Sequence, residues 1–352
     1  MTASSSGKVL ITGGAGFIGA NLADRLASDG CDVLVYDAMA RPGVERNLRW
    51  LQGRHPQRLT AVQADVRDET ALARALDGAD AVFHLAAQVA VTTSLADPVD
   101  DFTVNLTGTL NLLEAVRRAG RATPVIFAST NTVYGDLADL ALTLQDGAWL
   151  PEDPAMRDAG ISERRPLDFH TPYGCSKGAA DQYVLDYARS YDVPTAVLRM
   201  SCIYGPRQMG TEDQGWVAHF AIRALEGRPI TLYGDGRQVR DILDVRDAVE
   251  AYVQCWRRID AVSGQAFNLG GGSANAVSLR QLIGVIEAEV GRPVGVELSD
   301  WRAGDQKWFV ADASRARKAL GLPTPRPWRE GVPALIDWLQ GERATPALQA
   351  AQ

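Results

Sequence analysis

The sequence predicts an α/β fold in which a doubly wound parallel sheet is joined to a smaller α/β domain. Short apolar segments bounded by turns alternate with helical patterns through the first half of the chain, and this alternation implies right-handed crossovers between parallel strands. The first strand also leads directly into a glycine-rich turn and an apolar helix, the arrangement that begins a Rossmann-type sheet. A chain of 352 residues has room for both domains.

Each expected strand of the first half is a short run rich in Val, Leu, Ile or Phe. These runs are 8–12, 32–37, 59–65, 80–86 and 124–129. Apolar residues at helical spacing predict helices between them at 17–28, 69–76 and 101–118. A helix over 170–189 and a strand at 195–200 return to the same sheet, so we expect the first domain to span 1–204.

The remainder of the chain divides into three parts. The segment 136–168 contains prolines and acidic residues, and we expect a lid-like loop there, beside the site. We expect 205–340 to be mainly a substrate-binding domain, with some chain crossing back to the first domain; its helices are expected at 216–226, 245–258 and 278–290, and its strands at 229–234 and 265–271. Met1–Ser6 and 341–352 are expected to be disordered tails.

Composition excludes several classes of function. The formal charge of −7 provides no basic stripe, so we expect no nucleic-acid partner. No apolar run approaches the ~20 residues of a membrane span, and the first residues lack a signal-peptide pattern. Four scattered cysteines and four isolated histidines indicate reduced thiols and no metal site. We therefore expect a cytoplasmic protein that binds neither membranes nor metals.

The glycine-rich turn is a candidate phosphate cradle. Gly13, Gly16 and Gly19 form G-x-x-G-x-x-G between the first strand and the first helix. Glycine permits the turn and lets the backbone, with Phe17 and Ile18 at the helix start, approach a pyrophosphate. Many glycine triplets are merely close-packed turns, but the position of this one at the start of the βαβ series favours a bound dinucleotide.

Asp37, at the end of the second expected strand, indicates which dinucleotide the protein binds. A carboxylate there can accept hydrogen bonds from both adenosine ribose hydroxyls and would repel a 2′-phosphate, which favours NAD. Arg41 leaves NADP open as an alternative. In the other interpretation, Asp37 is a solvated acid in a turn.

Tyr173 and Lys177 lie four residues apart at the start of the helix over 170–189, and Pro172 suits its first turn. Residues i and i+4 share a helix face, so the phenol and the ammonium can point into the same space. An adjacent cation favours phenolate and thereby makes Tyr173 a better general base. A surface tyrosine and a solvated lysine would give the same spacing.

Motifs along residues 7–340 resemble the extended short-chain dehydrogenase/reductase family of nucleotide-sugar enzymes. They are TGGAGFIG, AD at 64–65, HLAAQ, NLTGTLNLLEA, STNTVYG, PYGCSK, LRMSCIYGP, GDGRQVRDILDVRD and RAGD. The resemblance implies a Rossmann-type fold, bound NAD, a nucleotide-sugar substrate and a helix-bundle dimer. It also implies that Tyr173 removes a proton from a sugar hydroxyl.

The resemblance assigns further roles residue by residue. Asp65 and Val66 are expected beside the adenine, and Asn105 is expected to support the catalytic helix. Lys177 is expected to bind the nicotinamide ribose, and Thr130 to hold the sugar hydroxyl as the family's catalytic Ser/Thr. The nicotinamide side of the cofactor is expected to contact Leu85, Ala86, Ala87, Gln88 and Ser129.

Within the family, 168–189 and 205–217 look most like epimerases acting at C2 of a CDP-hexose. A 4,6-dehydratase would carry Asp-Glu after the catalytic Thr, where this chain has Asn131 and Thr132. Epimerisation needs no group beyond the oxidation machinery. A 4-epimerase of UDP-sugars or another sugar epimerase is the first alternative. The second is a non-catalytic NAD sensor, although such proteins commonly lose the Tyr or Lys.

The substrate is expected to be a CDP-sugar or another nucleotide diphosphate sugar. Arg240 and Arg302 match positions that bind the diphosphate, or are surface arginines in ion pairs. Trp216 lines the nucleotide pocket or packs in a core, and His170 contacts the sugar or bonds the backbone near the helix start. The full set of expected substrate residues is Gln88, Thr93, Thr130, His170, Gln208, Trp216, Arg240 and Arg302.

Two positions depart from the family pattern. Ala38 follows Asp37 where a polar residue such as Asn is expected, so one ribose contact is missing. Cys202 stands where an Asn or Ser would face the sugar phosphates.

Overall fold

The computed structural model describes residues 7–349 and contains a central sheet of seven parallel strands. Their order is β12-β8-β5-β4-β1-β2-β3. In chain order they are β1 (Lys8–Thr12), β2 (Asp32–Asp37), β3 (Leu59–Gln63), β4 (Ala81–His84), β5 (Val125–Thr130), β8 (Thr195–Met200) and β12 (Gln265–Leu269). The predicted doubly wound, Rossmann-type fold is confirmed.

The strand order reverses between β1 and β4, which are hydrogen-bonded neighbours. Lys8 of β1 pairs with Asp32 of β2, and Thr12 of β1 pairs with His84 of β4, so β1 is the centre from which the sheet is built outward in both directions. In open parallel sheets, ligands bind at the carboxyl ends of the strands beside such a reversal.

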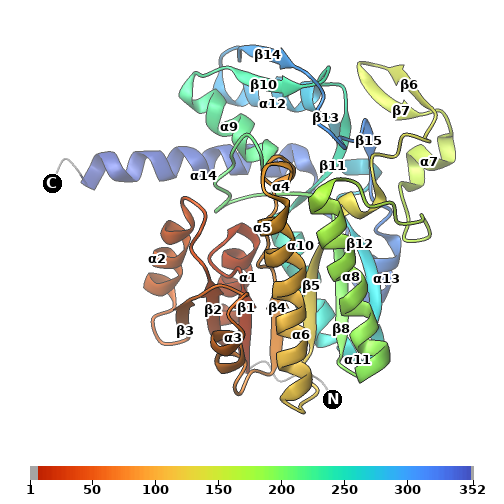
Figure 1. Ribbon diagram of the computed structural model, residues 1–352. Helices are drawn as coiled ribbons and strands as arrows, with labels where there is room; N and C mark the ends of the chain where they lie inside the picture. The colour runs from red at the N-terminus through yellow and green to blue at the C-terminus, as the bar shows by residue number, and fades with distance from the viewer. Residues whose placement is uncertain (1–6, 350–352) are drawn as a thin grey trace.

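Two layers of helices cover the sheet (Figure 1). One layer buries apolar side chains with a core that includes Leu22, Leu26 and Trp256; its helices are α1 (Phe17–Ser28), α2 (Val44–Arg54), α10 (Val245–Arg257), α11 (Ile259–Val262) and α13 (Ser314–Leu320). The other consists of α3 (Glu69–Ala75), α6 (Gly108–Arg118) and α8 (Thr171–Tyr191). Burying a Leu side chain contributes about 1.5–3 kcal/mol to the free energy of folding. Both helix layers are therefore packed firmly against the sheet that carries the site.

A second group of elements surrounds a core of its own at one end of the sheet (Figure 1). Its helices are α9 (Trp216–Glu226), α12 (Leu279–Val290) and α14 (Trp328–Gln349), and η3 (Ser273–Asn275) is a 3-10 turn. Its strands are β9 (Cys202–Tyr204), β10 (Ile230–Tyr233), β11 (Val239–Asp244), β13 (Ala276–Ser278), β14 (Val296–Ser299) and β15 (Trp308–Phe309). Between β11 and η3 the chain returns to the central sheet, where α10 and α11 join the first helix layer and β12 joins the sheet.

The segment 136–168, expected as a lid-like loop, contains regular structure. The antiparallel strands β6 (Leu142–Gln145) and β7 (Ala148–Pro151) form a hairpin, and α7 (Pro154–Ala159) follows. Asp146 and Gly147 connect the strands with φ values of 51° and 77°. An Asp-Gly pair is the preferred sequence for a two-residue hairpin turn with positive φ at both positions, which explains why a hairpin forms here.

The ends of the chain differ from the expected tails. Helix α14 continues to Gln349, whereas the sequence was expected to become disordered from 341; the Ala, Leu and Gln residues after 341 favour a helix. Residues 1–6 and 350–352 lie outside the described residues. Within the described part of the chain, no helix is both long enough and apolar enough to cross a membrane.

Candidate active site

The glycine turn between β1 and α1 has the geometry of a phosphate cradle. Gly13 has φ +68°, and a Cβ there would lie 2.7 Å from the backbone nitrogen of Ala86, so only glycine fits. Gly16 is the N-cap of α1 and makes no side-chain capping bond. The first amides of α1, including those of Phe17 and Ile18, are therefore left for an anion. This turn fits the pyrophosphate of a dinucleotide.

Asp37 lies beside the same turn. Its Oδ2 accepts from the backbone amide of Ala15 at 3.0 Å, and its Oδ1 accepts from that of Met39 at 2.9 Å. Because each carboxylate oxygen has two acceptor sites, the group can bind the turn and still accept from a ribose. The Arg41 side chain is exposed, and the charge of Asp37 acts on it. Ala38 has no polar side-chain group.

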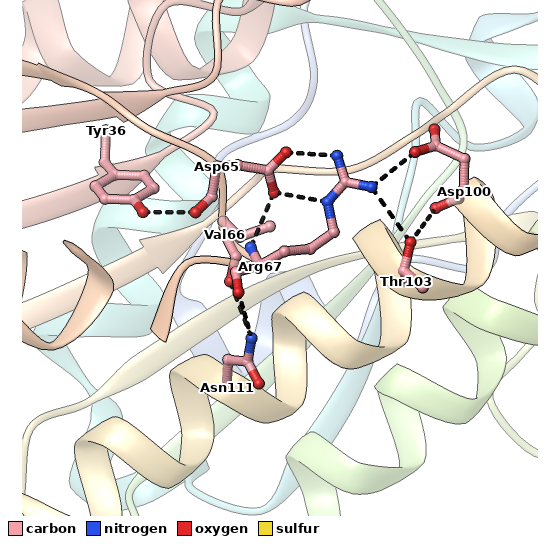
Figure 2. Close-up of polar contacts among 7 residues, drawn as sticks. All are labelled: Tyr36, Asp65, Val66, Arg67, Asp100, Thr103 and Asn111. Carbon is pink, nitrogen blue, oxygen red and sulfur yellow. Dashed lines mark hydrogen bonds and ion pairs between the residues drawn. The ribbon is translucent and has the colours of Figure 1, made fainter. Parts of the chain in front are cut away.

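Figure 2 shows the region expected to hold the adenine. Arg67 grips the Asp65 carboxylate with Nη2 at 2.6 Å and Nε at 3.0 Å, and its Nη1 reaches Asp100 at 2.8 Å and Thr103 at 3.3 Å. Hydrogen bonds from Arg67 are the main cause that lowers the pKa of Asp65. Val66 is buried, and a Cβ on Gly108 would lie 2.5 Å from its side chain. Asp65 is thus ionised and tied to α5 (Pro98–Phe102) and to η1 (Thr103–Thr107).

The nicotinamide side is expected at the loop after β4, where Leu85, Ala86, Ala87 and Gln88 are half-buried. Asn105 fixes this loop: its Oδ1 accepts from the Gln88 amide at 2.9 Å, and its Nδ2 donates to the Gln88 carbonyl at 3.0 Å. Asn105 lies in η1, a single π-helical turn within an otherwise α-helical run. Such π-turns redirect side chains and are frequent at functional sites.

Tyr173 and Lys177 lie in α8 and are buried, with exposed fractions of 9% and 3%, so the surface interpretation of this pair is wrong. Burial raises the pKa of Tyr173 to about 12, while a hydrogen bond with Thr130 opposes the rise. Thr130 ends β5, and its Oγ1 also accepts from the Thr132 amide at 3.1 Å. The phenol and the threonine hydroxyl can therefore act on one substrate oxygen.

Lys177 is almost completely shielded from solvent. Its Nζ lies 4.1 Å from the centre of the Phe127 ring, and burial lowers its pKa to about 7, against the charges of Asp181 and Asp101. A group that titrates near neutral pH at the end of a sheet is a recognised mark of a functional site. Burial therefore favours the neutral amine of Lys177, and the two carboxylates oppose this effect.

A buried ion pair anchors the middle of α8 to the sheet. Arg199 of β8 donates to Asp181 through Nε and Nη2, both at 2.9 Å. Ser129, expected to contact the cofactor, directs its hydroxyl to Asp181 at 2.7 Å instead. The Ser129 side chain therefore holds α8 in place.

The first turn of α8 has two unusual features. Thr171 has φ +61°, which is strained for a β-branched residue, and its Oγ1 accepts from the Gly174 amide at 3.3 Å. Ser94 of α4 (Val91–Ala96) accepts from the Tyr173 amide at 3.2 Å. His170 is the N-cap but makes no capping bond; its ring nitrogens lie 3.5 Å from Asp136 and 3.1 Å from Asp168. The expected bond from His170 to the helix backbone is not formed.

The two arginines expected at the diphosphate are already held by carboxylates. Arg240 is buried and donates to Asp305 at 2.5 Å. Arg302 donates to Asp213 at 3.4 Å, and its guanidinium stacks 3.8 Å from the centre of the Tyr233 ring. Each arginine is therefore in an ion pair, and each keeps further N–H donors for phosphate oxygens.

Cys202 and Trp216 lie against each other beside Arg240. The Trp216 indole donates to the Cys202 sulfur at 3.3 Å and packs edge-on against Phe220, so it combines core packing with a polar contact. Arg240 is among the charges that act on the Cys202 thiol. The structure thus places Cys202 near an arginine expected to bind the diphosphate.

Gln208 and Thr93 complete the expected substrate set. Gln208 is buried, its Nε2 donates to the Ile203 carbonyl at 3.1 Å, and its Oε1 has no hydrogen-bond partner among the described residues. A buried, unpartnered acceptor is costly, so Gln208 favours a ligand or water that donates to it. Thr93 is exposed on α4, one residue before Ser94.

Sequence reasoning missed several residues of the site: Ser94, Asp101, Ser176, Asp181, Arg199 and Asp305. Ser176 and Asp181 lie on the predicted catalytic helix, and their spacing, i+3 from Tyr173 and i+4 from Lys177, was an available signal. The others lie far from that helix in sequence, and only the fold brings them close.

Three comparisons with known proteins bear on this site. Residues 9–270 match the model of the NAD dependent epimerase/dehydratase family. A CDP-paratose 2-epimerase of Salmonella typhi is 40% identical over 94% of this chain and 98% of its own length. A UDP-glucose 4-epimerase of Mycolicibacterium smegmatis is 33% identical, with 95% and 99% covered. The solved UDP-glucose 4-epimerase of Thermus thermophilus, a complex with NAD, has a TM-score of 0.80 and 32% identity over 95% of this chain and 99% of that one.

Proposed function

The chain belongs to the NAD dependent epimerase/dehydratase family, and from this premise we propose that it inverts C2 of a CDP-hexose, as in the conversion of CDP-paratose to CDP-tyvelose. The relatives named above are epimerases, so it is an isomerase of the nucleotide-sugar type with NAD as its cofactor. The choice of CDP-hexose and of C2 rests on the 40% identity with the Salmonella typhi CDP-paratose 2-epimerase.

Epimerisation rather than dehydration is favoured by the residues after Thr130. Loss of a hydroxyl as water needs an acid beside the sugar, but Asn131 and Thr132 occupy these positions. The Asn131 amide also donates to Gln306 Oε1 at 2.9 Å, which directs it away from proton transfer. The oxidation machinery is therefore present without a dehydrating acid, and this observation carries the proposed reaction class.

The proposed chemistry uses three side chains. Thr130 holds the sugar hydroxyl, and Tyr173 in its phenolate form accepts the proton of that hydroxyl and becomes the neutral phenol. Lys177 stabilises the phenolate before this transfer and binds the nicotinamide ribose. Bound NAD supplies the acceptor, and later the donor, of the hydride at the same carbon. After the sugar turns over in the site, Tyr173 returns the proton to the oxygen of the inverted carbon. Each side chain returns to its starting protonation state, and the hydride returns to the sugar, so the reaction needs no external oxidant.

The sugar must turn while the substrate stays bound, so binding should come from the nucleotide and its phosphates. Arg240 and Arg302 supply guanidinium donors for the diphosphate, and Gln208 offers its unpartnered acceptor to the nucleotide. Asp305 and Asp213 keep the two arginines oriented before substrate arrives. A loosely held sugar and a firmly held diphosphate suit an epimerase.

A 4-epimerase acting on UDP-sugars is the second candidate, favoured by the 33% identity with the Mycolicibacterium smegmatis UDP-glucose 4-epimerase. For assembly we propose a homodimer through α4, α5 and α8, which expose the large apolar side chains of Leu95, Val99, Phe102 and Tyr183. We further propose a cytoplasmic location, because the four cysteines are scattered along the sequence without a paired motif.

Incubation with CDP-paratose and, separately, with UDP-glucose tests the function when the anomeric region of the product is followed by NMR. We expect CDP-paratose to be converted into an equilibrium mixture with its C2 epimer without added cofactor, and UDP-glucose to remain unchanged. Tyr173→Phe is the control for contaminating activity. Conversion of UDP-glucose at C4 with no change of CDP-paratose would select the second candidate.

A further inference from the structure

Asp101 is a fully buried carboxylate on α5, and no step of the proposed reaction uses it. Its Oδ2 accepts from Ser176 Oγ at 2.5 Å, and its Oδ1 accepts from Gln88 Nε2 at 2.9 Å and from Asn105 Nδ2 at 3.1 Å. Burial raises the pKa of Asp101, while the bonds from Ser176 and Gln88 and the charge of Lys177 oppose that rise. All three bonded partners are neutral donors. An ionised carboxylate accepts all three of these hydrogen bonds without any partner having to reorient.

Four titratable or charged groups, one each from α8, β8, β4 and α5, face Lys177 or its neighbours. Asp181, on the same helix, is neutralised by its two hydrogen bonds from Arg199 of β8. His84 of β4 is neutral, because burial is the main cause that lowers its pKa to about 3. Asp181 and then Asp101 are the two charges that raise the pKa of Lys177. Asp181 shares its charge with Arg199, whereas the hydrogen-bond donors to Asp101 among the described residues are neutral, so the charge of Asp101 acts on Lys177 without a cation of its own.

We propose that Asp101 is a positioning residue that supplies the counter-charge of the catalytic pair. Its carboxylate keeps Lys177 in the ammonium form, and its hydrogen bond with Ser176 holds the turn of α8 that carries Tyr173 and Lys177. Ser176 lies next to Lys177 and can also donate to the Tyr173 carbonyl at 3.2 Å. The inference rests on the proposed function for the roles of Tyr173 and Lys177.

The charge of Asp101 acts on both members of the pair in the same direction. A negative charge favours the protonated form of a neighbour, whether that form is the ammonium of Lys177 or the neutral phenol of Tyr173. Removing the charge should therefore lower the pKa of both groups. A residue that acts only on structure would change rates or stability without moving these titrations.

Asp101→Asn removes the charge with little change of shape. The new NH₂ group can donate to Ser176 Oγ, which can then donate to the Tyr173 carbonyl, while the remaining oxygen still accepts from Gln88 and Asn105. Asp186→Asn is the matched control, because Asp186 lies on the exposed part of α8 and pairs only with its own helix.

The test is a titration of Tyr173 that needs no sugar. The ultraviolet absorbance of tyrosinate is followed against pH for the protein as isolated. For each protein compared, the titration is repeated with Tyr173→Phe added, and the difference between the two curves is the titration of Tyr173. In Asp101→Asn we expect the apparent pKa of the pair to fall by roughly one unit or more, the usual effect of a close charge. Asp186→Asn should leave it unchanged. With an active substrate, both limbs of the pH–rate profile should move to lower pH.

An unchanged titration in folded Asp101→Asn would overturn the proposal. If this variant does not fold, Asp101→Ser, which is smaller and neutral, is expected to show the same fall. Failure of both neutral variants to fold would assign Asp101 to stability instead, and would also overturn it. Absence of turnover on CDP-sugars would contradict the proposed function but leave the sugar-free titration standing as a separate result.

Discussion

At the scale of single residues, the site joins a phenol that resists ionisation to a lysine that gives up its proton easily. Burial alone would leave Tyr173 a poor base, since its pKa is raised to about 12, and would leave Lys177 partly neutral, since its pKa is lowered to about 7. The hydrogen bond with Thr130 opposes the rise at Tyr173, and the charges of Asp181 and Asp101 oppose the fall at Lys177. Substrate and cofactor therefore enter a site whose protonation states are balanced by a few neighbours.

Tyr173→Phe is expected to abolish proton transfer but preserve the fold, because the ring remains and only the hydrogen bond with Thr130 is lost. Turnover of the CDP-sugar should fall by roughly 10²–10⁴. NAD content and the thermal unfolding midpoint should stay close to those of the unmodified protein. Tyr191→Phe at the end of the same helix, with 50% of Tyr191 exposed, should change none of the three quantities. Near-normal turnover in folded Tyr173→Phe would remove Tyr173 from the mechanism.

The sequence predicted the members of this site that follow a local rule. The i,i+4 spacing placed Tyr173 and Lys177 on one helix face, and the structure buries both on α8. It did not predict Ser94 and Asp101, because each contacts α8 across more than 70 residues of chain. A buried Asp has no sequence signature of its own until its donors are known.

At the scale of elements, the cofactor region depends on how the loop after β3 is tied to α5. Arg67 makes this connection by bonding Asp65 on one side and Asp100 on the other (Figure 2). The next residue after Asp100 is Asp101, which bonds the helix of the catalytic pair. The expected adenine end and the catalytic end of the site are thus supported by the same short helix.

Arg67→Met should weaken NAD binding while leaving the fold intact. The Asp65 carboxylate would lose its two side-chain donors, and with them its fixed orientation. Because Arg67 is 41% exposed, we expect a modest effect, a dissociation constant about 2–5-fold higher by equilibrium dialysis. Arg118→Met, which removes an exposed ion pair with Glu114 on α6, should bind NAD normally. Tighter binding by Arg67→Met would mean that Arg67 competes with the adenine.

Periodicity predicted most of the elements themselves, since strands with continuous apolar runs and helices with apolar faces are strong signals. It predicts a loop in place of the β6–β7 hairpin, because the prolines and acids around that segment outweigh the Asp146-Gly147 turn signal. It predicts plain helix at the π-turn η1, since one extra residue in a turn leaves the apolar pattern nearly intact. It does not predict α14, and it predicts a disordered tail from 341, because the last turns of that helix show no clear apolar face.

At the scale of the whole molecule, the second group of elements is fixed to the sheet by contacts on both sides of the site. Strand β12 joins the central sheet, and Arg207, after β9, lies between Trp50 of α2 at 4.0 Å and Trp338 of α14 at 5.3 Å. Glu342 lies 3.5 Å from the same arginine. The expected NAD residues and the expected diphosphate residues are therefore held in one framework, as a reaction between cofactor and sugar requires.

The central claim is that this framework inverts C2 by removing and returning the same hydrogen, and the fate of that hydrogen tests it most directly. CDP-paratose carrying deuterium at C2 is converted in ordinary water, unlabelled substrate is converted in D₂O, and both products are analysed by NMR and mass spectrometry. We expect deuterium to be kept at C2 in the first product and none to enter C2 in the second, because a hydride held within the site does not exchange with water. Solvent hydrogen at C2 would contradict this account, since it would show inversion through an enol instead of oxidation and re-reduction.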